Sequence, residues 1–318
     1  MSSKTLPSLA IICPCLNEEE IIADSLKKLL YKIKDLSDKK LIDFNYSKII
    51  LVDDGSTDRS WEILKECNKF EPKYTGIKLS RNFGHQNALL SGILTTSEDL
   101  IITIDLDLQD DLNVIDDMIK NYLKGYEIVY GIKSNRSANP FKKNFFADSF
   151  YFLLSLMGAK VIRNHADFRM LSKKAVQALR EFKEYNLYLR GIIPLLGFKS
   201  KNIEYTLKQR SSGNPSYTFK KSFSLAIHGV TSFSLAPLRA IGILGFIIAF
   251  FAILITAYFL IESIFSERTV PGWASTVLPI YFLGAVQLIS LGIISEYIGK
   301  LFLESKKRPN FIIEERIQ

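Results

Sequence analysis

The sequence predicts an α/β protein with a mostly parallel sheet, followed by a C-terminal hairpin of two membrane-spanning helices. Up to about residue 235, short apolar runs alternate with amphipathic segments, and acidic or amide side chains follow three of these runs. Beyond that point the chain contains two long uncharged stretches. Alternating strands and helices are typical of parallel sheets with right-handed crossovers. An uncharged stretch of about 20 residues is long enough to cross a bilayer.

The apolar runs define the expected strands, and the amphipathic segments between them define the expected helices. The strands are expected at residues 9–13, 48–52, 76–79, 100–104, 126–130 and 203–207, and the helices at residues 18–36, 58–70, 83–96 and 111–123. Cys13 and Cys15 alternate on the first strand, and three cysteines are too few for a disulfide framework, so both are expected to be small apolar core residues. Ligands of parallel sheets bind beyond the carboxyl ends of the strands.

Two aspartates, Asp105 and Asp107, end the strand at residues 100–104. Unpaired charges at the end of a buried strand are costly, and one residue of spacing lets both carboxylates reach a common point. Hard divalent cations such as Mg2+ and Mn2+ take oxygen ligands and also bind substrate phosphates. A solvated acidic loop is the simpler alternative, but a second strand ends in the same way, in Asp53-Asp54-Gly55-Ser56. Neither a glycine-rich dinucleotide motif nor a phosphate-loop lysine motif is present, which weakens a dinucleotide or ATP-hydrolysis interpretation.

The uncharged stretches, residues 240–261 and 269–295, are expected to form the transmembrane hairpin, with Pro271 and Gly272 in the loop before the second span. Two buried core helices are the alternative, but such helices are usually shorter and amphipathic. The loop between the two stretches holds two glutamates and one arginine, whereas the opposite side of the hairpin carries Arg239, Lys300, Lys306, Lys307 and Arg308. The positive-inside rule then places the N-terminal domain and both termini in the cytoplasm, with the chain multi-pass in the inner (plasma) membrane. The short polar segment at residues 1–6 predicts no cleaved signal peptide.

Residues 141–157 and 217–233 combine aromatic and aliphatic side chains with lysines, as helices in the headgroup layer do. Ordinary packing on the sheet is an equal alternative for the first segment, whereas the second leads directly into the hairpin. The net charge of +8 suggests an anionic partner, either nucleic acid, an acidic membrane surface or a phosphorylated substrate. Because the lysines lie beside apolar segments rather than in a separate basic domain, nucleic acid is disfavoured.

Taken together, the ordered motifs of the chain resemble the family-2 glycosyltransferases with the GT-A (Rossmann-like) fold. The motifs are Pro14-x-x-Asn17-Glu18-Glu19, Val52-Asp53-Asp54-Gly55-Ser56-x-Asp58, Ser80-Arg81-Asn82-x-Gly84 and Asp105-x-Asp107-x-Gln109-Asp110. Later motifs, Asp167-Phe168-Arg169 and Gln209-Arg210-x-x-Gly213-x-x-Ser216-Tyr217, together with the hairpin, are similar to the polyprenyl-phosphate branch. That branch includes dolichol-phosphate mannose synthases and bactoprenol glucosyltransferases.

The resemblance implies a membrane enzyme that transfers one sugar from a nucleotide donor to polyprenyl phosphate at the cytoplasmic face, with inversion, in cell-envelope glycosylation. UDP-glucose is the favoured donor, and GDP-mannose or another UDP-sugar is the alternative. A catalytically silent membrane adaptor or lipid carrier is an alternative of another class, against which the intact aspartate pair argues. The implied domains are a catalytic domain at 1–216 with an interfacial helix at about 138–157, an interfacial helix at 217–234, the hairpin at 235–300 and a cytoplasmic tail at 301–318. A homo-oligomer is compatible with the chain, and nucleic acid is not an expected partner.

The resemblance also implies roles for individual residues. The nucleotide sugar is expected to contact Pro14, Leu16, Glu18, Asp53, Asp54, Arg81, Asp105 and Leu106. The metal, Mg2+ or Mn2+, is expected to bind Asp105, Asp107 and Gln109. The expected catalytic residues are Asp105, Asp107, Asp167, Arg136 and Arg210, and the acceptor phosphate is expected to contact Arg136, Lys142 and Arg210. A guanidinium can bind phosphate with two parallel hydrogen bonds, which favours the arginines.

Three positions depart from the family pattern, because Asp111 replaces a proline, Lys133 an arginine and Asn139 an acidic residue. The departures concern acceptor binding rather than the type of reaction. Asp167 is expected to orient the acceptor rather than to act as a strong base, because a phosphate monoester with a second pKa of about 6 is already largely ionised at neutral pH. The alternative is that Asp167 pairs with Arg169 or caps the following helix.

Overall fold

The computed structural model describes residues 6–133, 165–182, 189–206 and 273–317, together with single positions between 241 and 254. The chain divides into two compact units. The first contains Met1–Ser155, Lys160–Ser216 and Arg308–Gln318, and the second contains Leu156–Ala159 and Tyr217–Lys307. Both predicted interfacial helices, at about 138–157 and 217–234, lie outside the described residues.

The first unit is built on one mixed sheet of eight strands in the order β7-β5-β6-β4-β1-β2-β3-β8. The strands are β1 (Leu9–Cys15), β2 (Lys48–Asp53), β3 (Tyr74–Leu79), β4 (Leu100–Thr103), β5 (Ile128–Lys133), β6 (His165–Ser172), β7 (Ser200–Tyr205) and β8 (Ile313–Ile317). The pairs within β4-β1-β2-β3 and the β5-β7 pair are parallel. β6 runs antiparallel between β4 and β5, and β8 runs antiparallel to β3. The predicted α/β fold with a mostly parallel sheet is confirmed.

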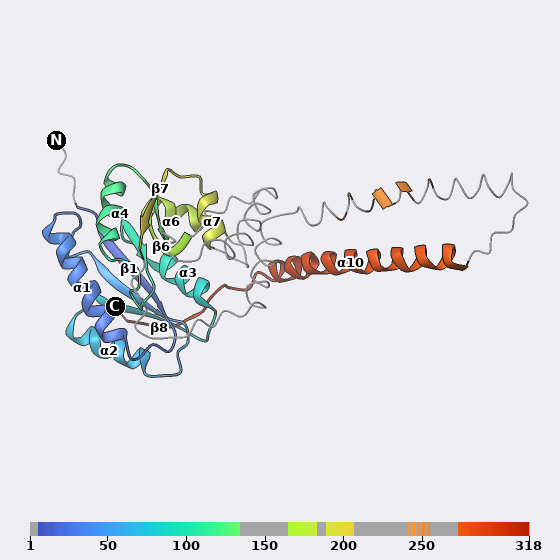
Figure 1. The fold of residues 1–318 in the computed structure, drawn as a ribbon. Coiled ribbons are helices and arrows are strands. Elements are labelled where there is room, and N and C mark those ends of the chain that lie inside the picture. The colour runs from blue at the N-terminus through green and yellow to red at the C-terminus, as the bar shows by residue number, and fades with distance from the viewer. Residues whose placement is uncertain are drawn as a thin grey trace, which may run out of the picture. The chain divides into compact units, whose positions relative to one another are not determined.

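Helices cover both faces of this sheet (Figure 1). On one face, α1 (Ile22–Asp38), α2 (Ser60–Phe70) and α4 (Val114–Leu123) share a hydrophobic core with alternate strand residues such as Ile11 and Cys13. On the other, α3 (His85–Thr95) packs on β1 and β2, and α6 (Lys173–Leu179) packs on β6. The approach of α3 is close, since a Cβ at Gly92 would lie 2.6 Å from Cγ2 of Ile12. Cys13 and Cys15 are buried and unpaired, as predicted.

The predicted strands and helices of the first 130 residues are present with small differences at their ends. α1 begins at Ile22 rather than at residue 18, because residues 17–21 form a turn in which Asn17 has a φ of 53° and the amide of Ile21 donates to the carbonyl of Glu18. The sequence analysis assigned neither β6 nor the short helices α6 and α7 (Leu189–Leu195).

The last strand, β8, lies within the segment expected to be a cytoplasmic tail. It extends the sheet beyond β3, and the backbone amide of Ser80 donates to the carbonyl of Ile312. The Glu315 carboxylate accepts a hydrogen bond from Nε1 of Trp61 at 2.9 Å and pairs with Lys65. The end of the chain is therefore part of the sheet-containing unit.

The second unit contains α10 (Trp273–Ser305), a helix of 33 residues. Its window Val286–Ser305 is long and apolar enough to cross a membrane, and none of that window is buried. Large apolar side chains such as Leu288, Ile289 and Leu301 are more than half exposed. The predicted second span overlaps α10, which continues ten residues past position 295. The described positions between 241 and 254 are helical, and the remainder of the predicted first span lies outside the described residues.

Candidate active site

The candidate site lies beyond the carboxyl ends of β4, β1 and β2, which are adjacent in the sheet. The loops after β1 and β2 are joined by hydrogen bonds. The amide of Asn17 donates to Oγ of Ser56 at 3.0 Å, and the amide of Thr57 donates to Oδ1 of Asn17 at 2.8 Å. The amide of Glu18 donates to Oγ of Ser60 at 3.1 Å. These bonds fix Glu18 at the edge of the sheet.

The loop after β2 carries two buried carboxylates with different surroundings. Asp53 accepts a hydrogen bond from the amide of Ser56 at 3.0 Å, and burial raises the pKa of its carboxyl group. Asp54 accepts the amide of Phe83 at 2.7 Å and the amide of Gly84 at 2.9 Å. Asp54 therefore holds in place the residues that precede α3. Asp53 is the last residue of β2, and its side chain is fully buried. Gly55 has a φ of +74°, and a Cβ there would lie 2.5 Å from the carbonyl carbon of Arg81, so the loop requires glycine.

Three carboxylates form the acidic part of the site. Burial, with the charges of Asp107 and Asp105, raises the pKa of Glu18 to about 7. Burial and the neighbouring carboxylates also raise the pKa of Asp105 above its usual value, although His85 opposes this shift. The exposed Asp107 accepts a hydrogen bond from Nε2 of Gln109 at 2.6 Å. Such mutual repulsion is relieved when a cation binds.

The acidic part suits a metal that is shared with a ligand rather than one enclosed by protein. Among the described residues, no group of three or more His, Cys, Asp or Glu side chains could hold a metal ion. Mg2+ and related ions are commonly bound through one or two carboxylates, with substrate phosphates and water in the other positions. Asp105 and Asp107, with the amide of Gln109 beside Asp107, fit that donor set. The raised pKa values of the neighbouring Glu18 and of Asp105 are the electrostatic signature expected of such a site.

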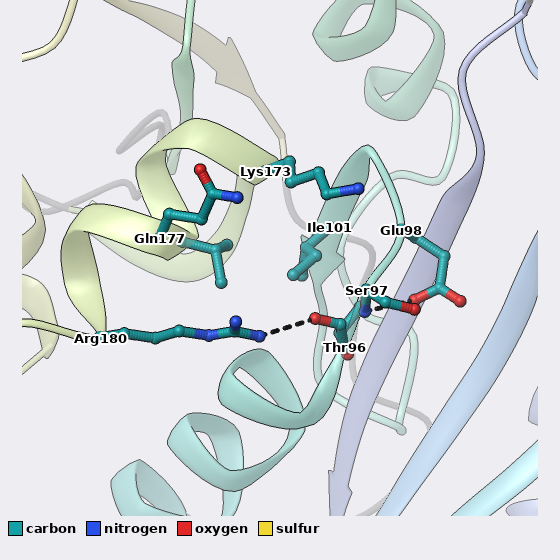
Figure 2. A pocket seen from close by; sticks show the side chains of 8 residues that line it. Thr96, Ser97, Glu98, Ile101, Lys173, Gln177 and Arg180 are labelled. Carbon is teal, nitrogen blue, oxygen red and sulfur yellow. Dashed lines mark hydrogen bonds between the residues drawn. The ribbon is translucent and has the colours of Figure 1, made fainter.

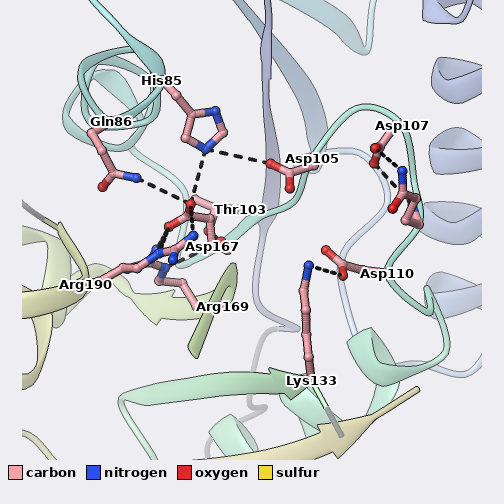
Figure 3. Close-up of polar contacts among 11 residues, drawn as sticks. His85, Gln86, Thr103, Asp105, Asp107, Asp110, Lys133, Asp167, Arg169 and Arg190 are labelled. Atoms are coloured by element: carbon pink, nitrogen blue, oxygen red, sulfur yellow. Dashed lines mark hydrogen bonds and ion pairs between the residues drawn. The ribbon is translucent and has the colours of Figure 1, made fainter. Parts of the chain in front are cut away.

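Asp167 is the centre of a second cluster (Figure 3). β6 runs antiparallel to β4, so its beginning lies beside the end of β4, and the hydroxyl of Thr103 donates to the backbone carbonyl of Asp167. The Asp167 carboxylate pairs with the buried Arg169. Arg190 of α7 binds the same carboxylate through Nε at 3.2 Å and Nη2 at 2.8 Å. Nε2 of His85 lies 3.3 Å from Asp167 and 3.8 Å from Asp105, so it connects the two clusters.

This arrangement keeps Asp167 ionised. Burial alone would raise its pKa, but hydrogen bonds from His85 and Arg190 and the charge of Arg169 hold the pKa of Asp167 well below its usual range. Burial lowers the pKa of His85, but the hydrogen bond to Asp167 and the charge of Asp105 outweigh it and raise the pKa. The alternative pairing of Asp167 with Arg169 is present, whereas the cap of α6 is Ser172, whose Oγ accepts the amide of Ala175.

Asp110 supports the border of the site. Its buried carboxylate accepts a hydrogen bond from the hydroxyl of Tyr205 at 2.6 Å, and Nζ of Lys133 lies 3.5 Å away. Burial and the Asp110 carboxylate raise the pKa of Tyr205. Lys133, which stands where the resemblance implies arginine, thus lies beside Asp110, the residue that follows Gln109.

The structure places the predicted site residues in different surroundings. Glu18, Asp53, Asp105 and Asp167 lie at one edge of the sheet. The side chain of Leu106 packs in the hydrophobic core, and the exposed Arg81 stacks on Phe83. Pro14 is buried within β1, and Leu16 is exposed just after that strand. Arg136, Lys142 and Arg210 lie outside the described residues.

Sequence reasoning did not assign His85, Gln86 or Arg190 to the site. His85 directly follows the Ser80-to-Gly84 motif, which is the one signal that could have identified it. Nε2 of Gln86 donates to Asp167 at 3.3 Å. Arg190 stands alone among apolar residues, and no spacing rule connects it with Asp167.

A separate pocket lies at the opposite end of β4 (Figure 2). It is lined by Thr96, Ser97, Glu98, Ile101, Lys173, Val176, Gln177 and Arg180. Nη2 of Arg180 donates to the carbonyls of Leu94 and Thr96. Because Asp105 follows the other end of the strand, this pocket is not part of the candidate site.

Comparison with known proteins shows that the chain belongs to glycosyl transferase family 2, whose family model matches residues 10–180. An uncharacterized glycosyltransferase, YkoT of Bacillus subtilis (strain 168), is 43% identical over 310 residues, covering 97% of this chain and 91% of that protein. The bactoprenol glucosyl transferase of Shigella phage SfX is 33% identical over 310 residues, covering 97% and 99%. The chain is therefore an enzyme of the glycosyltransferase class.

Among solved structures, the mannosyltransferase PcManGT from Pyrobaculum calidifontis, in complex with GDP-Man and Mn2+, is 15% identical with a TM-score of 0.45. That similarity covers 65% of this chain and 59% of that chain.

Proposed function

We propose that this glycosyltransferase moves one sugar from a nucleotide donor to the phosphate of a polyprenyl phosphate. The observation that carries the proposal is the division of the site into an acidic part at Glu18, Asp105 and Asp107 and a cationic part at His85, Arg169 and Arg190. A metal-bound diphosphate suits the first part and an anionic acceptor suits the second. Similarity to bactoprenol glucosyl transferase also extends well beyond the family domain.

Within this proposal the donor is UDP-glucose, and GDP-mannose or another UDP-sugar is the alternative. The nucleoside is bound by the loops after β1 and β2, with Pro14, Leu16 and Glu18 beside the base and ribose and Asp53 beneath them. Asp54 contributes by holding the backbone at Phe83 and Gly84. Arg81 remains a proposed contact of the nucleotide sugar, and Arg136, Lys142 and Arg210 remain proposed contacts of the acceptor phosphate.

Asp105 and Asp107, supported by Gln109, are proposed to hold Mg2+ or Mn2+. When bound there, the ion supplies Lewis-acid neutralisation of the departing diphosphate. Burial and repulsion by Asp107 and Asp105 raise the pKa of Glu18 to about 7, so Glu18 would release its proton more readily with the ion bound nearby.

The reaction is proposed as a single displacement with inversion. A phosphate oxygen of the acceptor forms a bond to the anomeric carbon as the bond from that carbon to the diphosphate oxygen breaks. The acceptor is already anionic, so no strong base is needed, and positioning supplies most of the acceleration. A carboxylate held as firmly ionised as Asp167 is a poor proton acceptor, so its proposed role is orientation of the cations around it.

The protein is proposed to be anchored in the inner membrane by α10 and the preceding span, with the catalytic domain and both termini cytoplasmic. The exposed apolar surface of α10 supports membrane association. A cysteine introduced at Ser305 and probed with an impermeant reagent in intact cells tests the orientation. External labelling would contradict it.

The function is tested with purified full-length protein, radiolabelled nucleotide sugars and a polyprenyl phosphate. Labelled lipid is expected with UDP-glucose. If labelled lipid forms only with GDP-mannose or another UDP-sugar, that nucleotide sugar is the donor instead of UDP-glucose. Absence of labelled lipid with every donor would reject the proposal and favour an adaptor or lipid carrier.

A further inference from the structure

The cluster around Asp167 brings three nitrogen-bearing side chains to one carboxylate. One carboxylate contacts two guanidinium groups, of Arg169 and Arg190, and an imidazole, of His85. A guanidinium group at the edge of an active site attracts anions.

The two arginines differ in how far their side chains are exposed. The side chain of Arg169 is 1% exposed, whereas that of Arg190 is 39% exposed. Arg169 thus contacts Asp167 inside the protein, whereas part of the Arg190 side chain reaches solvent. Figure 3 shows both arginines approaching the same carboxylate.

The orientation of Arg190 is fixed by two contacts to Asp167. Nε faces Oδ1 and Nη2 faces Oδ2, at 3.2 Å and 2.8 Å. Two parallel contacts of this kind restrict a guanidinium to one plane. A side chain restricted in this way loses less conformational entropy when it binds a ligand.

The cluster also lies next to the reacting centre. Nε2 of His85 is 3.3 Å from Asp167 and 3.8 Å from Asp105. One imidazole therefore separates the Arg190–Asp167 pair from a carboxylate proposed to hold the metal. An anion bound by Arg190 would be close to the diphosphate of the donor.

We propose that Arg190 is a phosphate-binding residue of the active site, positioned by Asp167. The ligand is a phosphoryl group, either the monophosphate of the lipid acceptor or the diphosphate of the donor. This inference rests on the proposed function for the identity of its ligands. It gives Asp167 a definite role, which is to hold the phosphate-binding guanidinium in place.

The test compares Arg190→Lys with the wild type in full-length protein in detergent. Lysine keeps the charge and loses the fork. Arg180→Lys is the matched control, because Arg180 follows α6 and lines the pocket at the opposite end of β4, outside the candidate site. Equilibrium affinities are measured for two probes by calorimetry: UDP with Mn2+, and farnesyl phosphate, a short polyprenyl monophosphate.

Arg190→Lys should weaken one probe by about tenfold or more, as expected for loss of a hydrogen bond to a charged group. Weaker farnesyl phosphate binding assigns Arg190 to the acceptor, and weaker UDP binding assigns it to the leaving diphosphate. Both affinities within about twofold of wild type would overturn the proposal. These binding measurements need no turnover. An absence of sugar transfer by the wild type would therefore reject the proposed function, while the effect of Arg190→Lys on probe affinity could still be interpreted.

Asp167→Asn tests the positioning role. It should weaken the same probe as Arg190→Lys, and the double variant should be no weaker than the worse single variant, because both act through one contact. If the two losses of affinity multiply in the double variant, or if Asp167→Asn weakens only the other probe, the positioning role of Asp167 is contradicted. If Asp167→Asn does not fold, as shown by its thermal transition, Arg190→Lys still decides the binding role.

Discussion

Replacing Asp54 with asparagine should both destabilise the protein and weaken nucleotide binding. The Asp54 side chain is buried, and its two carboxylate oxygens accept the backbone amides of Phe83 and Gly84. These residues directly precede α3, whose first residue is His85. Asparagine can accept only one of the two amides, and its NH2 group would face the other N–H, so two donors would meet.

The magnitude follows from these contacts. A hydrogen bond to a charged group contributes about 1.5–3 kcal/mol, and a neutral one contributes about 1 kcal/mol. Asp54→Asn loses one charged bond and converts the other to a neutral bond, so the expected cost is about 2–5 kcal/mol. At about 2–4 °C per kcal/mol for a domain of this size, the melting temperature should fall by about 4–20 °C.

The assay is thermal unfolding of the full-length protein in detergent, followed by tryptophan fluorescence, together with UDP affinity. Trp61 is buried against the sheet and reports on the unit that contains the site. Asp43→Asn is the control, because Asp43 accepts a single exposed amide, that of Asn45. Surface changes of this kind shift stability by about 0.5 kcal/mol or less. An Asp54→Asn protein that matches the control in both stability and UDP affinity would refute the reasoning.

Three further predictions concern the acidic part of the site and the C-terminal strand. Asp107→Ala should lower kcat by about 100-fold or more while membrane insertion is kept, because a Lewis-acid contribution of several kcal/mol is lost; full turnover by this variant, or by wild type in excess EDTA, would contradict the metal site. Glu18→Gln should stabilise the protein in EDTA above pH 7, because a folded-state pKa raised from 4.5 to about 7 makes the ionised carboxylate unfavourable, and the gain should fade as the pH falls toward 4.5. Melting curves between pH 4 and 9 measure this gain, and a gain confined to acidic pH would contradict the prediction. Deleting residues 309–318 should lower the melting temperature and leave membrane association intact, since it removes β8 and the contacts of Glu315 with Trp61 and Lys65; unchanged melting would show that β8 contributes little.

Local sequence pattern predicted the core of the fold well. Alternating and continuous apolar runs marked β1 to β5, and amphipathic segments marked α1 to α4, because burial on one or both faces of a sheet dictates those patterns. The position of Glu18, Asp53 and Asp105 at strand ends also followed from the sequence, since parallel strands that neighbour one another end at the same edge.

Tertiary structure decided the parts that depend on pairing between distant segments. β6 reverses direction between β4 and β5, and only that reversal places Asp167 beside Asp105. β8 is a charged segment whose strand conformation depends on pairing with β3. His85 and Arg190 meet at Asp167 from α3 and from α7, which lie about 100 residues apart in sequence.

The sequence by itself therefore determined three features: the pattern of strands and helices, the location of the acidic residues at one edge of the sheet, and the apolar character of the C-terminal helix. The tertiary structure alone decided which cations surround Asp167 and which of them reaches solvent. The physical reason is that hydrophobic periodicity is a local property of the chain, whereas ion pairing depends on strand direction and order, which are fixed by contacts between residues far apart in sequence.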